Sequence, residues 1–170
     1  MDDSALLQKL TSTSKDDVLD ALAEIQRNRD TPPPAEVVER CLELISHPDS
    51  EIRHETVFAM GLHWGERRTL PALLAMLRGQ EKEPDIQAIA ARAVGSIFLQ
   101  NGGLDPEALK VLARITLDEE ANAEVRGIAY MSARTAAGLL TSQECARLPE
   151  DIRQLPVDWN WLKDINNREH

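Results

Sequence analysis

The residues of this chain that could take part in chemistry are its histidines, its cysteines and its many acids. His47, His63 and His170 stand where a turn, a helix end and the terminus are expected, and their spacing does not suit a shared metal ion. Cys41 and Cys145 form no C-x-x-C pair, which argues against a zinc site or a disulfide scaffold. Their number and setting are typical of buried thiols in a reducing compartment.

Sequence patterns typical of enzymes are also missing. There is no G-x-S-x-G and no G-x-x-x-x-G-K motif, and carboxylate pairs on solvated helix faces are routine. The 29 acidic residues outnumber the 19 basic ones and give a formal net charge of −10. This charge repels nucleic acids and anionic membranes but attracts a basic protein. We therefore expect no catalysis, no cofactor, and a protein as the partner.

The elements that must position any functional side chain come from a repeat. A β-branched residue recurs at intervals of 34, 34 and 39 residues, and a core-compatible residue follows each one seven positions later. The anchors are Val18, Ile52, Ile86 and Val125, followed by Ile25, Ala59, Ala93 and Ser132. Units of this size cannot bury their own apolar faces, so they must stack and present a long surface.

Each unit reads as helix, turn, helix. Ser14 with Asp17 resembles a helix cap, and breaks are expected at residues 31–34, 47–50, 79–84 and 101–107. Apolar residues are spaced by three and four, almost without alternating runs, which favours helices over strands. Small residues on the second helices, such as Ala93, allow close helix packing. The predicted fold class is all-α.

The stretch from Pro48 to Gly61 resembles the second-helix consensus of the HEAT-repeat family, which has an Asp in the turn, a Val-Arg-like pair and an Ala-Leu-Gly-like triplet. Val125-Arg126 repeats the pair and Ala93-Val94-Gly95 the triplet. Gln87 and Arg134 depart from the expected Arg and Gly, so the ladder of hydrogen bonds between turn acids and Arg is incomplete. The resemblance, to a small stand-alone bacterial member, implies a right-handed α-solenoid of about four HEAT-like hairpins over residues 1–140. Residues 141–170 would form a C-terminal capping segment of the same domain.

The resemblance also implies which side chains look out. Second helices of the family line the concave side of the solenoid, and the matching positions here form a strip with an apolar centre, as protein interfaces have. The predicted partner-binding residues are His54, Glu55, Phe58, Leu62, Ile89, Arg92, Ile128 and Met131. The alternative is that the helical register differs by one residue and these side chains pack inward.

The pair His54-Glu55 resembles the iron ligands of deoxyhypusine hydroxylase, a HEAT-repeat enzyme. The equivalent positions in the other units hold Asp20-Ala21, Ala88-Ile89 and Gly127-Ile128, which cannot supply a di-iron centre. We expect His54 to be a polar contact residue. HEAT-like DNA glycosylases use a basic groove, which the charge contradicts, and chromophore lyases with these repeats stay as an alternative that no residue supports.

After Leu140 the repeat pattern ends and the composition of the sequence changes. In a helix, Trp159 and Leu162 would share a face with Ile165, while Trp161 would turn away. One ring would then close the last repeat, and the other, Trp161, would stay partly exposed as a possible partner contact.

We therefore predict a non-enzymatic protein-binding module, and as the most concrete case an immunity protein that neutralises a basic bacterial toxin. A general adaptor or scaffold subunit is the alternative, and a HEAT-type enzyme such as a chromophore lyase or hydroxylase is a further one. The acidic start Met1-Asp2-Asp3-Ser4 and the lack of a long apolar stretch predict a cytoplasmic protein without a signal peptide.

Overall fold

The computed structural model describes residues 3–28 and 30–167, and every regular element in these ranges is helical. Hairpin 1 pairs α1 (Asp3–Leu10) with α2 (Lys15–Arg27). Hairpin 2 pairs α3 (Ala35–Leu44) with α4 (Ser50–Thr56) and its wider π-helical continuation η1 (Val57–His63). Hairpin 3 pairs α5 (Leu70–Ala75) and η3 (Met76–Gln80) with α6 (Pro84–Asn101), after the short η2 (Arg67–Thr69). Hairpin 4 pairs α7 (Pro106–Leu117) with α8 (Ala123–Ala136).

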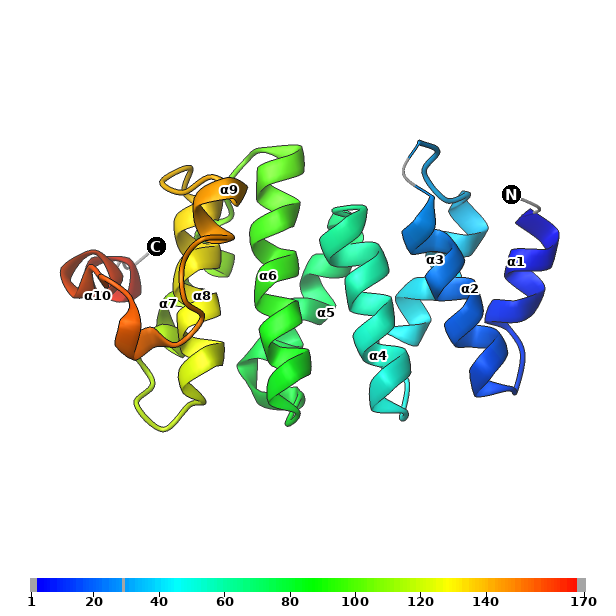
Figure 1. Ribbon diagram of the computed structural model, residues 1–170, viewed down its shortest axis with the longest axis horizontal. Helices are drawn as coiled ribbons and strands as arrows, with labels where there is room; N and C mark the ends of the chain where they lie inside the picture. Colours follow the sequence, from blue (N-terminus) through cyan, green and yellow to red (C-terminus); the bar gives the residue numbers. More distant parts are fainter. Residues whose placement is uncertain (1–2, 29, 168–170) are drawn as a thin grey trace.

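The four hairpins stack side by side, with the second helices α2, α4, α6 and α8 in the front layer (Figure 1). Helices α3, α5 and α7 lie behind them, and α1 lies beside α2 at the N-terminal end. The predicted all-α solenoid is confirmed. We call the outward side of the second helices the second-helix face. The chain then continues through α9 (Ser142–Cys145), η4 (Ile152–Gln154) and α10 (Trp159–Asn167).

Helix starts follow the capping chemistry in the sequence. The Ser14 side chain accepts a hydrogen bond from Asp17 N at 3.4 Å, as predicted, and the Asp49 carboxylate accepts from Glu51 N and Ile52 N at 3.0 and 3.3 Å. Helix α8 ends at Ala136, before the predicted end near residue 140, because Gly138 turns the chain with a φ of 69°.

Close packing between second helices depends on small residues. Helix α6 lies between η1 and α8 and packs against both. A Cβ added at Gly61 would lie 2.7 Å from Ala93 Cβ, and one at Gly95 would lie 3.2 Å from the Ser132 backbone and side chain. Larger side chains at these positions would push the hairpins apart.

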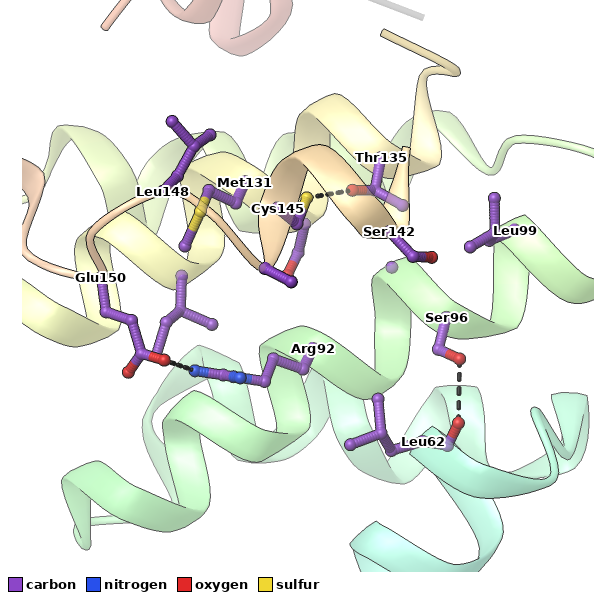
Figure 2. A pocket seen from close by; sticks show the side chains of 14 residues that line it. Leu62, Arg92, Ser96, Leu99, Met131, Thr135, Ser142, Cys145, Leu148 and Glu150 are labelled. Carbon is purple, nitrogen blue, oxygen red and sulfur yellow. Dashed lines mark hydrogen bonds and ion pairs between the residues drawn. The ribbon is translucent and has the colours of Figure 1, made fainter. Parts of the chain in front are cut away.

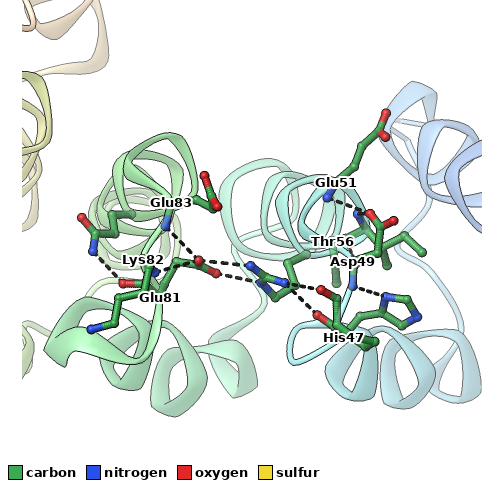
Figure 3. Close-up of polar contacts among 11 residues, drawn as sticks. His47, Asp49, Glu51, Thr56, Glu81, Lys82 and Glu83 are labelled. Atoms are coloured by element: carbon green, nitrogen blue, oxygen red, sulfur yellow. Dashed lines mark hydrogen bonds and ion pairs between the residues drawn. The ribbon is translucent and has the colours of Figure 1, made fainter.

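The turns of hairpins 2 and 3 are joined by Arg53 (Figure 3). Its guanidinium donates to His47 O and Pro48 O, both at 3.0 Å, and to both carboxylate oxygens of Glu81, at 2.7 and 3.1 Å. Glu81 is 4% exposed. Burial raises the pKa of its carboxyl, but Arg53 and the N–H groups of Lys82 and Glu83 outweigh burial and hold this pKa below its usual range.

The corresponding residues of the next two hairpins bond only within their own turns in the described part of the chain. Gln87 Nε2 donates to Glu81 O at 2.7 Å, and Arg126 Nε donates to Thr116 O at 3.1 Å. Gln87, which departs from the family pattern, thus still satisfies a turn carbonyl as its Arg counterparts do.

Residues 141–155, which we call the strap, cross the outer side of α8 (Figure 1). The crossing is close, because a Cβ at Gly127 would lie 1.8 Å from Glu150 O. Ile152 and Leu155 are buried where the strap ends. Only a glycine in α8 leaves room for this backbone.

Helix α10 then packs against α7 and buries Leu162 and Ile165. The prediction that Trp159 closes the last repeat was wrong, while Trp161 is partly exposed as predicted. Trp161 is the half-buried ring, in edge contact with Tyr130 at 6.4 Å between centroids and beneath the Arg134 guanidinium at 5.4 Å, whereas Trp159 is 42% exposed. Trp159 is the first residue of α10 and lies beside the 117–126 turn region, so it does not reach the core that Leu162 fills.

Candidate functional site

The second-helix face is open over the first three hairpins. His54, Glu55, Phe58 and Leu62 are all partly exposed there, as predicted. Glu55 joins two hairpins, since its carboxylate accepts a hydrogen bond from Gln26 Nε2 at 2.7 Å and lies 2.9 Å from His54 Nδ1. The face therefore presents an apolar pair between polar groups that are already held by hydrogen bonds.

Arg92 continues this surface on α6. Its side chain is exposed, and its Nη2 forms an ion pair with Glu150 of the strap. An exposed ion pair of this kind contributes little stability, about 0–1 kcal/mol, so either partner can exchange it for another.

Three predicted contact residues are not exposed, which corrects the predicted strip. Ile89 is 7% exposed, because α6 has helices on both sides and buries more of its circumference than a terminal helix would. Ile128 and Met131 are 3% and 7% exposed, because the strap covers α8. Ile128 and Met131 are therefore buried on the outer side of α8 beneath the strap, and not by the inward packing that the alternative register implies.

A pocket of about 280 Å³ remains between α6, α8 and the strap (Figure 2). We call it the strap pocket. Leu62, Leu99, Ile128, Met131 and Leu148 give it apolar walls. It therefore brings together four of the predicted contact residues, Leu62, Arg92, Ile128 and Met131.

The polar groups of the strap pocket lie at its edges. The Arg92–Glu150 pair spans one side of the mouth, and Thr135 Oγ1 contacts Cys145 Sγ at 3.1 Å on the opposite side (Figure 2). Ser96 Oγ donates to Leu62 O at 2.9 Å, and the Ser132 and Ser142 side chains also line the pocket. The arrangement suits a ligand with an apolar body and one polar end.

Sequence reasoning missed the contribution of the strap, namely Cys145, Leu148 and Glu150. Two signals could have pointed to it. Gly127 occupies a strip position in the middle of a helix, where glycine is unfavourable unless another backbone approaches. Leu148-Pro149 and Leu155-Pro156 place extended backbone directly after the repeats.

The described residues contain no group of three or more His, Cys, Asp or Glu side chains that could hold a metal ion. His47 Nδ1 accepts from Asp49 N at 3.1 Å, and His63 Nε2 lies 3.0 Å from Asn28 O, so both rings have structural partners. His170, Met1 and Asp2 lie outside the described residues. Burial raises the pKa of the Cys41 thiol to about 12, so this cysteine is an inert core residue.

Within residues 3–28 and 30–167, no helix is both long and apolar enough to cross a bilayer. The stacked hairpins, the open helical face and the side pocket define the class of protein: an α-solenoid scaffold.

A comparison with models of protein families identifies the family of this scaffold. A model of HEAT repeats matches residues 38–134, more than half of the chain, so the chain belongs to the HEAT-repeat family. HEAT repeats generally form non-catalytic scaffolds, and they indicate a protein-interaction module here. Searches of curated proteins and of solved structures give no match.

Proposed function

We propose that this HEAT-repeat chain is a binding module whose open second-helix face, over α2, α4 and α6, holds a basic protein partner. The observation that carries this proposal is the pair Phe58 and Leu62, left partly exposed between the polar groups of His54, Glu55 and Arg92. An apolar centre with a polar rim is typical of protein interfaces. The formal charge of −10 favours a basic partner and fast association at low salt.

The biological setting that we propose is neutralisation of a secreted bacterial toxin by a cytoplasmic immunity protein. An inhibitor needs surface and charge but no chemistry, and the described residues offer no metal cluster or catalytic motif. A tight inhibitor buries about 800 Å² per partner. Three adjacent second helices, each about 20 Å long and about 10 Å wide, offer a surface on that order.

The test is partner capture from the native host, followed by measured binding of the purified pair. Phe58→Asp should weaken binding at least tenfold while the circular dichroism spectrum stays helical, because a charge would be buried in the apolar centre. Leu104→Asp is the matched control, since Leu104 is exposed on the loop between α6 and α7. Equal affinity of both variants would refute the assignment of the face.

The immunity role needs its own measurement. Co-expression of this chain with the product of an adjacent toxin gene should restore growth, and the Phe58→Asp variant should not. Binding should also weaken as salt rises, because charge attraction is screened over about 8 Å at physiological ionic strength. A partner that stays fully active in the complex would exclude neutralisation.

One observation favours an adaptor as the second candidate. Leu99 and Leu139 are exposed where α6 and α8 end, which adds apolar surface beyond Phe58 and Leu62. An adaptor would hold two different proteins at once. Recovery of a ternary complex, in which Leu139→Asp removes one protein and Phe58→Asp the other, would favour the adaptor over the inhibitor.

A further inference from the structure

We propose that the strap pocket binds an aliphatic monocarboxylate, with the hydrocarbon chain between α6, α8 and the strap and the carboxylate on Arg92. This site borders the open face and shares Leu62 and Arg92 with it, but its other walls come from α8 and the strap. The proposal goes beyond the proposed protein binding, because a small ligand can occupy this pocket in the absence of a protein partner.

The apolar lining and the volume of the pocket indicate the size and the aliphatic character of the ligand. Leu62, Ile128, Met131 and Leu148 surround most of the space, and Leu99 is an exposed side chain at its edge. The volume of about 280 Å³ corresponds to roughly nine water-sized groups, at ~30 Å³ each. A straight chain of seven carbons fits this space.

The charged end follows from Arg92. Its contact with Glu150 uses Nη2, and within the described residues no other hydrogen bond of this guanidinium is present. A guanidinium has five N–H donors in a planar fork that matches a carboxylate. Arg92 can therefore bind a ligand carboxylate at the pocket mouth with the donors that Glu150 leaves free.

The Glu150 carboxylate determines whether removal of its charge strengthens or weakens ligand binding. Its carboxylate competes for Arg92 and repels an anionic ligand, and it lies on the strap rather than on a repeat helix. The net charge of −10 also opposes an anion, but this repulsion is largely screened beyond about 8 Å at physiological salt. Removal of the Glu150 charge should therefore tighten binding of a carboxylate, and it would weaken binding of an amine.

The experiment is a titration of the whole chain with sodium octanoate, followed by methyl NMR and calorimetry. We expect shifts of the Met131, Leu62 and Leu148 methyl groups but not of Leu22, which lies in the core of hairpin 1. Arg92→Gln should weaken octanoate binding about tenfold, because a charge-assisted hydrogen bond is lost. Glu150→Gln should strengthen it, and n-octylamine and 1-octanol should bind more weakly than octanoate.

Two further variants test the location of the ligand. Ala146 is exposed and lines the pocket from the strap, so Ala146→Phe should fill the space and abolish binding, and Ala146→Ser should leave it intact. No methyl shift at ~10 mM octanoate, where a Kd of ~1 mM gives near saturation, would overturn the proposal. So would octylamine binding as tight as octanoate, or octanoate affinity that Arg92→Gln leaves unchanged. None of these results bears on the protein partner, which the titration does not contain.

Discussion

Replacement of Gly127 by alanine tests the strap most directly. The new Cβ would lie 1.8 Å from Glu150 O, 2.8 Å from Glu150 C and 2.9 Å from Ile152 N. These are backbone atoms, so no side-chain rotation relieves the clash. The strap must move by about 1.7 Å to reach an ordinary contact of ~3.5 Å.

The expected magnitude comes from two opposing effects. Alanine in place of glycine inside a helix stabilises by about 1 kcal/mol. Overpacking costs about 1–3 kcal/mol, and full release of Ile152 and Leu155 would cost about 1.5–3 kcal/mol for each side chain. We expect Gly127→Ala to lower the free energy of unfolding by about 1–3 kcal/mol, which corresponds to roughly 2–4 °C in Tm per kcal/mol.

Hydrogen exchange gives the local readout that an unfolding curve lacks. The Gln154 N–H, which donates to Asp151 O at 3.0 Å, and the Leu155 N–H, which donates to Ile152 O at 3.2 Å, should exchange faster in Gly127→Ala. Amides of α2 should not change. Gln143→Ala, an exposed change in the strap, is the control and should stay within about 0.5 kcal/mol. A variant that is about 1 kcal/mol more stable with unchanged strap exchange would refute the described path of the strap.

Two other predictions concern buried groups. Glu81→Gln should destabilise by about 1–3 kcal/mol, because Arg53 loses its anionic partner. The folded pKa of Glu81 lies below its ordinary value of 4.5, so its contribution is present above pH 4.5 and is lost as pH falls through the folded pKa. Urea titrations of Glu81→Gln should thus show a smaller loss of stability on acidification than the natural chain, and equal slopes would contradict the pair. With a thiol reagent at pH 8, the half-buried Cys145 should react before Cys41, whose pKa burial raises to about 12. Fast labelling of both thiols without denaturant would contradict the core position of Cys41.

The repeat architecture could be predicted because its determinants are local. The anchors Val18, Ile52, Ile86 and Val125 are all buried, and the caps at Ser14 and Asp49 form as their sequence context indicates. Capping chemistry and apolar period act within one or two helical turns, so a single sequence displays them.

The covered part of the face could not be predicted in the same way. Burial of Ile128 and Met131 depends on a segment that follows them by about twenty residues and has no period of its own. Its path is set by contacts distant in sequence, such as Arg92 with Glu150 and Gly127 with the strap backbone. The inward placement of Trp159 was wrong for a related reason, because Trp159 is the first residue of α10 and the exact start of a helix is poorly defined by sequence.

Because of the strap, the number of hairpins is larger than the number of second helices that are open to a partner. Residues 3–28 and 30–167 form four hairpins, yet the tail covers α8 and borders α6, so within this part of the chain the fully open surface lies over the first two second helices and part of the third. Duplication of a hairpin between the second and third units would lengthen the uncovered stretch by one helix and leave the tail in place. Duplication after the fourth would instead separate the tail from Gly127 and Arg92. In a lineage that gains or loses modules, growth is therefore compatible with this ending only before the third hairpin, because α6 and α8 both contact the tail.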